Sequence, residues 1–219
     1  MLKGFVFDLD GVITDTAILH YQSWKQMVAK LGIDYTEADN EKLRGLPRKD
    51  TLIAILKLYN YDYSELDLDH ICEEKNELYK KLLTTEINEN SILPGVKNFL
   101  DQAKSHGIKL AIASSSFNAP VILEKLKIKD YFDFIVNPGT VKHGKPAPDI
   151  FIAAAHGLGL DVSECIGFED AIAGVKGIKD ANMVAVAITN EDPSEFAIAD
   201  LILKSTSELD YDKVAHLVK

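Results

Sequence analysis

Acidic residues stand close together near the start of the chain. The segment FVFDLDGVITD, residues 5–15, places Asp8 and Asp10 directly after a short apolar run. A DxDG segment is more often than not only a turn, because Asp and Gly favour turn geometry. The same residue types at the same spacing also suit a site for a cation and a nucleophile. Which of the two applies depends on the residues that the fold brings beside them.

Three further polar clusters follow apolar runs along the chain. They are Ser114-Ser115-Ser116, Lys145-Pro146 and Glu169-Asp170. Each cluster alone is a weak signal, since serines before a helix commonly cap it and paired acids commonly complement a helix dipole. In an open parallel sheet, however, the crevice beyond the carboxyl ends of the strands collects such residues in one place. Four clusters in this order therefore predict a common site.

The clustered residues are suited to phosphoryl transfer. The carboxylates of Asp8 and Asp170, with the backbone carbonyl of Asp10, form an all-oxygen ligand set of the kind that Mg²⁺ prefers. Asp8 could attack phosphorus as a nucleophile, and Asp10 could act as general acid and base. Ser114 would hold phosphoryl oxygens while Lys145 shares the developing charge.

Several carboxylates in one crevice repel one another and repel an anionic substrate. A bound cation relieves this repulsion, and Lys145 would assist it. We therefore expect Mg²⁺ as the cofactor, with metal ligands Asp8, Asp10, Glu169 and Asp170.

The elements that would position these clusters alternate between strand and helix. Apolar runs typical of strands occupy 4–8, 109–113, 133–136, 164–167, 184–188 and 201–203. Helical periodicity occupies 96–105, 118–127, 147–156 and 171–180. Such alternation predicts an α/β fold, a doubly wound parallel-sheet (Rossmann-like) core with helices on both faces.

Residues 14–89 interrupt this alternation. They contain no convincing strand, and apolar residues such as Trp24, Val28 and Leu31 recur at helical spacing. We expect a catalytic core made of residues 1–13 and 90–219, with residues 14–89 inserted as an all-helical cap domain. The two connections between core and cap could serve as hinges.

The composition excludes several classes of function. The 219-residue chain has 34 acidic and 24 basic side chains and a formal net charge of −10, which disfavours binding to nucleic acid or to an anionic membrane. Cys72 and Cys165 stand far apart, which indicates neither a disulfide framework nor a zinc site. No stretch resembles a signal peptide or approaches the roughly 20 apolar residues of a membrane span. We expect a cytoplasmic protein.

Taken together, the four motifs resemble those of the haloacid dehalogenase superfamily of phosphotransferases. Within it, the chain is most similar to the β-phosphoglucomutase family, in FDLDGVITDT (7–16), SSSFN (114–118), GKPAPDIFIAAA (144–155) and GFEDAIAGVKGIKDA (167–181). The resemblance implies interconversion of β-D-glucose 1-phosphate and glucose 6-phosphate on an aspartyl-phosphate enzyme. It implies β-glucose 1,6-bisphosphate as primer and intermediate, and we expect a monomer that binds a small-molecule sugar phosphate.

The resemblance also implies a set of substrate-binding residues. In the cap they are His20, Trp24, Gly45, Arg48, Thr51 and Lys75, and in the core they are Ser115, Ser116 and Asn118. It implies that His20 and Lys75 link cap closure to the general acid, and that Arg48 grips the non-reacting phosphate, for which a guanidinium offers bidentate donors. The alternatives are core packing for His20 with Trp24, and solvated charges for Arg48 and Lys75.

The chain departs from the family pattern at one position directly after the serine cluster. Phe117 stands before Asn118, where the pattern carries a Lys, so a cation expected near the distal phosphate is missing. Lys142 or His143, which replace small residues of the pattern, could compensate.

Two other functions remain open. A sugar-phosphate phosphatase of the same superfamily would let water, rather than a sugar, attack the aspartyl phosphate. A non-catalytic phosphate-ligand binding domain could use the same scaffold, since fold does not fix function. The presence of Asp8, Asp10 and Lys145 favours an enzyme over the second alternative.

Overall fold

The chain divides into two compact units in the computed structural model, which describes all residues except 44–45, 190–191 and 219. One unit, the core, comprises Met1–Asp15 and Asn88–Lys219, and the other, the cap, comprises Thr16–Ile87. These divisions lie two residues from the boundaries expected from the sequence.

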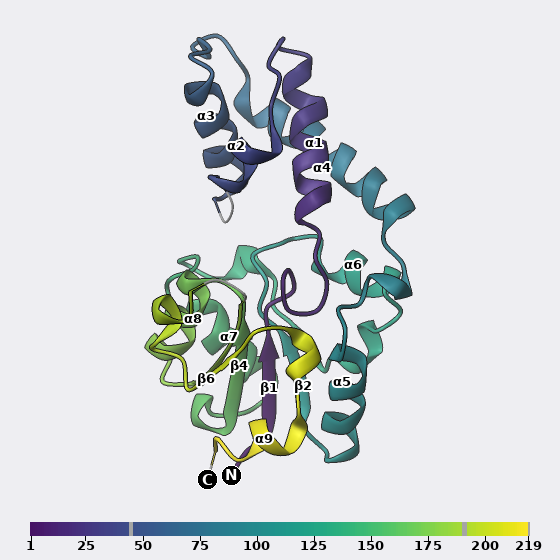
Figure 1. Ribbon diagram of the computed structural model, residues 1–219, viewed down its shortest axis with the longest axis vertical. Coiled ribbons are helices and arrows are strands. Elements are labelled where there is room, and N and C mark those ends of the chain that lie inside the picture. The colour runs from purple at the N-terminus through teal and green to yellow at the C-terminus, as the bar shows by residue number, and fades with distance from the viewer. Residues whose placement is uncertain (44–45, 190–191, 219) are drawn as a thin grey trace. The chain divides into compact units, whose positions relative to one another are not determined.

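The core is built on one parallel sheet. Its strands are β1 (Gly4–Phe7), β2 (Lys109–Ile112), β3 (Phe134–Ile135), β4 (Cys165–Glu169), β5 (Val184–Ile188) and β6 (Leu201–Leu203). Their order across the sheet is β3-β2-β1-β4-β5-β6 (Figure 1). The chain moves outward from β1 to β3 and then returns to the other side of β1, so the order reverses between β1 and β4. The predicted doubly wound sheet is confirmed, and ligands bind such sheets at this reversal.

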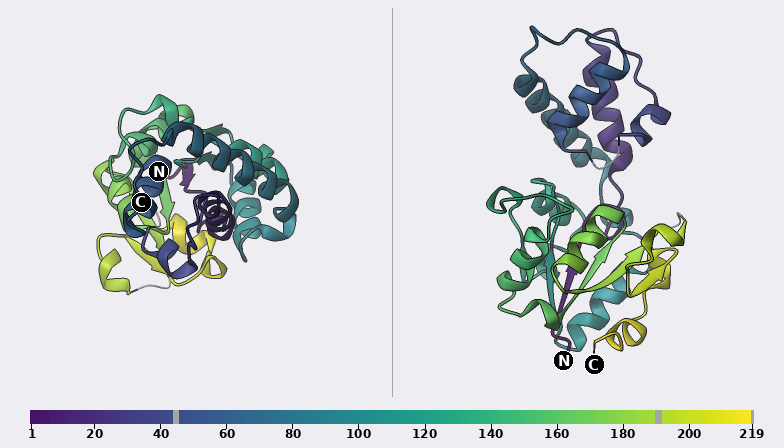
Figure 2. Two further views of the ribbon diagram at one scale, coloured as in Figure 1. Left: turned by 90° about the horizontal axis from the view of Figure 1, so that it is seen from above. Right: turned by 90° about the vertical axis from the view of Figure 1, so that its left-hand side faces the viewer.

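Helices connect the strands of the core. The α-helices are α5 (Val96–Ser105), α6 (Ala119–Lys125), α7 (Asp149–Gly157), α8 (Ile172–Asp180) and α9 (Tyr211–Ala215). Short 3₁₀ turns are η1 (Glu89–Ser91), η2 (Lys129–Tyr131), η3 (Pro138–Thr140), η4 (Val162–Glu164), η5 (Pro193–Phe196) and η6 (Thr206–Glu208). Met1 and α9 lie near the amino end of β1, so the carboxyl ends of the strands form the opposite edge of the core (Figures 1 and 2).

Alternate residues of β1 face opposite sides of the sheet. Val6 packs in a buried cluster with Phe151 of α7 and Ile178 of α8. Phe7 points to the other side, where its ring stacks on Phe168 with centroids 4.5 Å apart and planes 14° apart. The same aromatic layer includes Phe5 and Phe99 of α5, among other rings. Because a strand buried on both faces needs apolar residues at every position, the run GFVF is continuous rather than alternating.

Every regular element in the described residues of the cap is a helix. Its helices are α1 (Ala17–Ala29), α2 (Glu37–Glu41), α3 (Arg48–Leu58) and α4 (Leu68–Glu86). They enclose a separate apolar cluster that includes Trp24, Val28, Leu52 and Ile55. Caps mark where two of the helices begin, since the side chain of Thr36 accepts from Asp39 N and that of Asp67 from His70 N. Within the described ranges of the chain, no helix is long and apolar enough to cross a membrane.

Candidate active site

The pairing of β1 with β4 places two acids side by side. Phe7 lies opposite Phe168 in this pair, and Asp8 N donates a hydrogen bond to the Phe168 carbonyl at 2.9 Å. Asp8 follows the last residue of β1, and Glu169 is the last residue of β4. Both side chains therefore stand at the carboxyl edge of the sheet, and both are buried, with Glu169 only 1% exposed.

Lys145 joins these two carboxylates. Its Nζ lies 2.6 Å from Asp8 Oδ1 and also donates to Glu169 Oε1. The lysine comes from the segment between η3 and α7, and its ammonium stands 5.1 Å from the centroid of the Phe151 ring. The arrangement places a half-buried ammonium between two buried acids, so the fold brings residues of three of the sequence clusters together.

Asp170 completes an acidic cluster with Asp8 and Glu169. Each of the three offers a carboxylate oxygen, and these oxygens lie within 4.8 Å of one another. The second oxygen of Glu169 accepts from the backbone N–H groups of Asp170 and Ala171, at 3.0 and 2.9 Å. An acid oriented in this way can present its remaining lone pairs to an ion or to Lys145.

Two glycines leave room for this cluster. A Cβ at Gly11, whose φ is +78°, would collide with the Asp170 carboxylate. A Cβ at Gly174, near the start of α8, would collide with the Glu169 carboxylate. Gly11 of DxDG and Gly174 of GFEDAIAG are therefore needed for space, and Gly11 is also needed because its backbone is left-handed.

The charges of the cluster do not balance without a further cation. Burial raises the pKa of Asp8 well above its ordinary value, and the neighbouring charges of Glu169 and Asp10 act in the same direction, against the attraction of Lys145. Burial alone would lower the pKa of Lys145, but the charges of Asp8 and Glu169 outweigh it and raise that pKa. One ammonium thus faces an excess of carboxylates. An all-oxygen set of two or three carboxylates with spare negative charge fits Mg²⁺.

Asp10 lies within the turn that follows β1. Gly11 N donates to the Thr14 carbonyl at 2.7 Å, and Asp10 and Thr14 form an isolated parallel bridge. Ile13 N donates to the Leu9 carbonyl at 2.9 Å, so local bonds close the turn. Asp10 is half-buried, and its charge acts on Asp8.

The serine cluster follows β2, beside β1 in the sheet. Ala113 N donates to the Phe7 carbonyl at 2.8 Å, which brings Ser114 next to the turn of Asp8. Ser114 is buried, and its Oγ accepts from Ser116 N at 3.1 Å. An accepting hydroxyl still has a hydrogen to donate. Ser115 is exposed, whereas Asn118 is buried at the residue preceding α6.

Three of the predicted cap residues lie together in the cap. Lys75 Nζ lies 2.8 Å from His20 Nδ1 and 5.0 Å from the centroid of the Trp24 ring. Lys75 is 2% exposed and Trp24 is buried in the cap core, so Lys75 is not a solvated charge. Burial and the nearby charge of Arg48 lower the pKa of Lys75 to about 7. Burial, with Lys75 and Arg48, lowers the pKa of His20 to about 3.

Tyr79 is a member of this group that the sequence analysis missed. Its ring stacks on His20 with centroids 4.1 Å apart, Lys75 Nζ stands 4.9 Å from its centroid, and its hydroxyl lies 2.8 Å from Thr16 Oγ1. Tyr79 stands one helical turn after Lys75 on α4, and that spacing was the available signal.

The remaining cap residues have different surroundings. Arg48, at the first residue of α3, donates from Nη2 to Asn76 Oδ1 at 3.0 Å. Thr51 Oγ1 donates to the Pro47 carbonyl at 3.0 Å, which keeps its hydroxyl within the first turn of the same helix. Gly45 lies outside the described residues.

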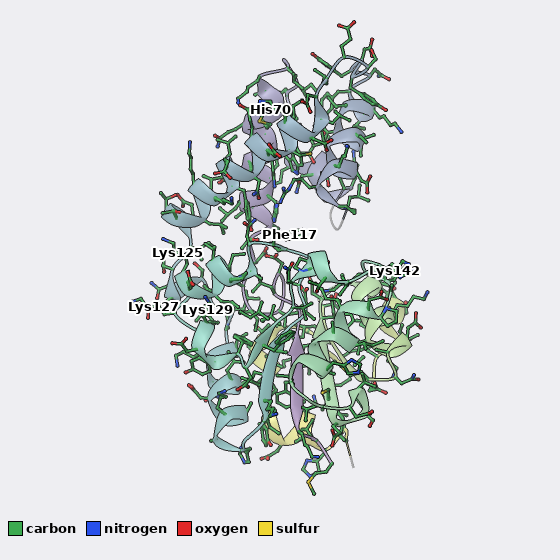
Figure 3. The ribbon with its side chains drawn as sticks, turned by 180° about the vertical axis from the view of Figure 1, so that it is seen from behind. His70, Phe117, Lys125, Lys127, Lys129 and Lys142 are labelled. Atoms are coloured by element: carbon green, nitrogen blue, oxygen red, sulfur yellow. The ribbon has the colours of Figure 1, made fainter. Side chains whose placement is uncertain are left out.

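The two residues named as possible replacements for a missing cation differ from each other. His143 is tied to Asp149, which accepts from its backbone N–H at 3.1 Å and lies 3.2 Å from its Nδ1. Lys142 is exposed at the edge of the core that also carries Phe117 (Figure 3).

Comparison with known proteins places the chain in a family. The model of haloacid dehalogenase-like hydrolases matches residues 2–182. A β-phosphoglucomutase of Bacillus subtilis (strain 168) is 40% identical over 95% of this chain and 92% of its own. A fructose-1-phosphate phosphatase of Escherichia coli (strain K12) is 31% identical over 84% of this chain and 95% of its own.

Solved structures agree with these relatives. The crystal structure of a β-phosphoglucomutase from Clostridium difficile has a TM-score of 0.89 and 41% sequence identity, covering 100% of this chain and 97% of that chain. The resemblance predicted from the four motifs is confirmed. The chain belongs to the haloacid dehalogenase-like hydrolase family of enzymes.

Proposed function

We propose that the protein is a Mg²⁺-dependent β-phosphoglucomutase that interconverts β-D-glucose 1-phosphate and glucose 6-phosphate. The observation that carries the proposal is the cluster of buried Asp8 and Glu169 with half-buried Lys145 and Asp170 at the reversal point of the sheet. The 40% identity to a protein named β-phosphoglucomutase supports the choice of reaction.

Asp8 is the nucleophile of the proposed reaction. One of its carboxylate oxygens attacks the phosphorus of a sugar phosphate, a P–O bond to Asp8 forms, and the P–O bond to the sugar breaks. Asp10 gives its proton to the departing sugar oxygen and later takes the proton of the hydroxyl that attacks the aspartyl phosphate. The hydroxyl of Ser114 and the ammonium of Lys145 hold the phosphoryl oxygens as charge develops on them.

Mg²⁺ bound by Asp8, Asp10, Glu169 and Asp170 would supply positive charge to the phosphoryl group and to the acids. The donor set described above fits that role. The aspartyl phosphate formed from the primer, β-glucose 1,6-bisphosphate, gives its phosphoryl group to the free 6-hydroxyl of β-glucose 1-phosphate. The bisphosphate made in this way then rebinds the other way round and passes its 1-phosphoryl group to Asp8, which releases glucose 6-phosphate and restores the aspartyl phosphate.

The cap supplies the second anion site of the proposal. Arg48 grips the phosphate that is not reacting, and His20 with Lys75 relays the cap position to the general acid. Trp24 and Thr51 shape the cap around them, and Gly45 is proposed as a further substrate-binding residue. In the core, Ser115, Ser116 and Asn118 supply hydroxyl and amide donors for the bound sugar phosphate.

A second candidate is a sugar-phosphate phosphatase of the same family. It is favoured by the 31% identity to a fructose-1-phosphate phosphatase over most of both chains. The two activities share every step up to the aspartyl phosphate, and they differ only in whether a sugar hydroxyl or water attacks it.

The two candidates are separated by following both products at once. The protein is incubated with Mg²⁺, β-glucose 1-phosphate and a trace of β-glucose 1,6-bisphosphate, and glucose 6-phosphate and free phosphate are measured. Primer-dependent glucose 6-phosphate with little free phosphate supports the mutase. Free phosphate as the main product supports the phosphatase. If neither product forms, both candidates are contradicted.

A further inference from the structure

An exposed aromatic side chain stands beside the serine cluster. Phe117 is 65% exposed, the largest exposed fraction of any aromatic residue among the exposed large apolar side chains that the structure describes. It lies between half-buried Ser116 and buried Asn118, on the segment that leads from β2 to α6. Figure 3 shows it at the edge of the core that also carries Lys142. An aromatic ring left in water at this edge has no role in the core packing.

The position of Phe117 is fixed by its own loop. Ser114 Oγ accepts from Ser116 N at 3.1 Å, and Ser116 Oγ accepts from Asn118 N at 3.2 Å, so two successive turns hold the backbone on both sides of the ring. The ring also lies against Gly139 of η3, where an added Cβ would come within 3.2 Å of Phe117 Cε1. One part of the ring is therefore supported by protein and the rest faces solvent.

The chemistry of this loop suits an uncharged part of a ligand. Residues 113–120, ASSSFNAP, carry no charged side chain. They do carry hydroxyl groups and an amide around one aromatic ring, and binding sites combine apolar contact with a few placed polar groups in this way. A pyranose offers the matching surface, because C–H groups form an apolar face and hydroxyl groups surround it.

We infer that Phe117 contacts the sugar ring of the substrate and determines which hexose phosphates the enzyme accepts. The inference rests on the proposed function and adds the substrate class: pyranose phosphates whose equatorial hydroxyl groups leave a C–H face open. An axial hydroxyl interrupts that face and weakens the contact. Phe117 thus contacts the neutral ring of the ligand, while the hydroxyl of Ser114 on the same loop serves the phosphoryl group.

The test compares substitutions that keep or remove the ring. Phe117→Leu keeps apolar bulk without an aromatic face, and Phe117→Tyr keeps the face. Phe134→Leu is the matched control, since Phe134 is another partly exposed aromatic of the core, 36% exposed, whose ring lies against Gly157 of α7 rather than against Gly139. The substrates are β-glucose 1-phosphate, its epimer β-galactose 1-phosphate with an axial hydroxyl, and acetyl phosphate, which has no sugar.

We expect Phe117→Leu to lower kcat/KM for β-glucose 1-phosphate about three- to tenfold, the range of a lost aromatic contact. The preference for the glucose over the galactose substrate should fall with it. Phe117→Tyr and Phe134→Leu should stay within about twofold of the unmodified chain by the same measure. Labelling of Asp8 by acetyl phosphate should be unchanged in all variants.

Two outcomes would overturn the inference. One is unchanged kcat/KM and unchanged preference in Phe117→Leu, and the other is an equal loss with acetyl phosphate, which would mean damage to the loop. The proposed mutase activity is judged separately, from the product of the unmodified chain. If that product is free phosphate, the same ratios are measured on phosphate release, whereas no turnover of either hexose phosphate would overturn both proposals.

Discussion

Lys145 Nζ lies 2.6 Å from Asp8 Oδ1, although 137 residues separate the two in the chain. The same ammonium donates to Glu169, so one cation serves two buried acids from neighbouring strands. Removing it would leave these carboxylates without a counter-charge at the buried edge of the sheet.

The first prediction follows from that loss. Lys145→Met should lower the free energy of unfolding by about 3–5 kcal/mol in the absence of divalent cations, the usual cost of leaving a buried charge unpaired. Mg²⁺ should restore part of the loss because it supplies positive charge to the same acids. Urea unfolding with and without Mg²⁺ measures both effects. Lys176→Met is the control, since its exposed pair with Asp180 is worth little, and equal losses in the two variants would contradict the prediction.

A substitution of Gly11 tests the proposed metal site without changing any of the proposed metal ligands. Gly11→Ala places a Cβ against the Asp170 carboxylate, so we expect Mg²⁺ affinity to fall about 10- to 100-fold, as when a supporting residue of a metal site is changed. Calorimetric titration with Mg²⁺ measures it. Gly107→Ala is the matched control, because Gly107 also has a positive φ of +72° but nothing within 4 Å of an added Cβ. Both variants should show the backbone strain of about 1–2 kcal/mol, and a similar fall in affinity in both would refute the argument.

Asp10→Asn separates proton transfer from binding. The amide keeps the size of the side chain and its backbone carbonyl but cannot give or take the proton. Phosphoryl transfer should fall by ~10²–10⁴-fold while Mg²⁺ and sugar phosphate still bind. Turnover and calorimetric binding are measured on the same preparation. Near-normal turnover would remove Asp10 from the proposed mechanism.

Arg48 is predicted to bind the sugar bisphosphate through its distal phosphate. Arg48→Ala should weaken β-glucose 1,6-bisphosphate roughly 10- to 100-fold, the range for a lost hydrogen bond to a charged group, and should change the reaction with acetyl phosphate little. Lys49→Ala is the control, because Lys49 is exposed on the same turn and pairs with Asp69. Steady-state kinetics with both phosphoryl donors gives the comparison, and equal effects on the two donors would argue against a distal-phosphate role.

The pKa of Lys75 makes the stability of the cap depend on pH. Lys75 has a pKa of about 7 in the folded chain against 10.5 ordinarily, so between these values the unfolded state binds more protons than the folded state. The free energy of unfolding should therefore rise with pH from 7 to 8.5, with a slope of at most about 1.4 kcal/mol per pH unit from this group.

Other titratable or charged groups face Lys75, namely His20 of α1, Arg48 of α3, and Cys72 and Tyr79 of α4. Burial raises the pKa of Cys72 above its ordinary value of 9.0, so its opposing effect develops as the unfolded thiol ionises around pH 9, above most of the window from 7 to 8.5. Denaturant unfolding followed by Trp24 fluorescence measures the cap, because Trp24 is the single tryptophan and lies in the cap core. Lys75→Met should flatten the slope, and an unchanged slope would show that Lys75 does not cause it.

The apolar runs were sufficient to predict the strands, because a buried parallel strand needs apolar residues at nearly every position. The end of β4 shows the limit of that signal. The run ECIG ended the predicted strand at Gly167, yet the strand continues to Glu169. A buried acid in a strand is tolerated there because Lys145, 24 residues away, and two backbone N–H groups bind its carboxylate. Local pattern contains no information about that partner.

The candidate site was predictable where residues follow strands and less so elsewhere. Asp8 and Glu169 come together because their strands pair, and strand order follows from the reversal of a doubly wound sheet. Tyr79 could not be distinguished from an ordinary core residue of an amphipathic helix. Its stacking on His20 depends on how α1 packs against α4, which helical periodicity does not determine.

The stacked rings of Phe7 and Phe168 have a consequence for the acids that follow them in sequence. Asp8 follows Phe7 in the chain, and Glu169 follows Phe168. Successive side chains of a strand point to opposite faces, so the rings lie on one face of the sheet and the acids begin on the other. The pairing of β1 with β4 sets the spacing of the two carboxylates at about 4.8 Å between strands, and the stacked rings support that pair from the other face of the sheet. A substitution in this aromatic layer can therefore shift the ends of β1 and β4, and with them both acids, without changing a group of the proposed active site.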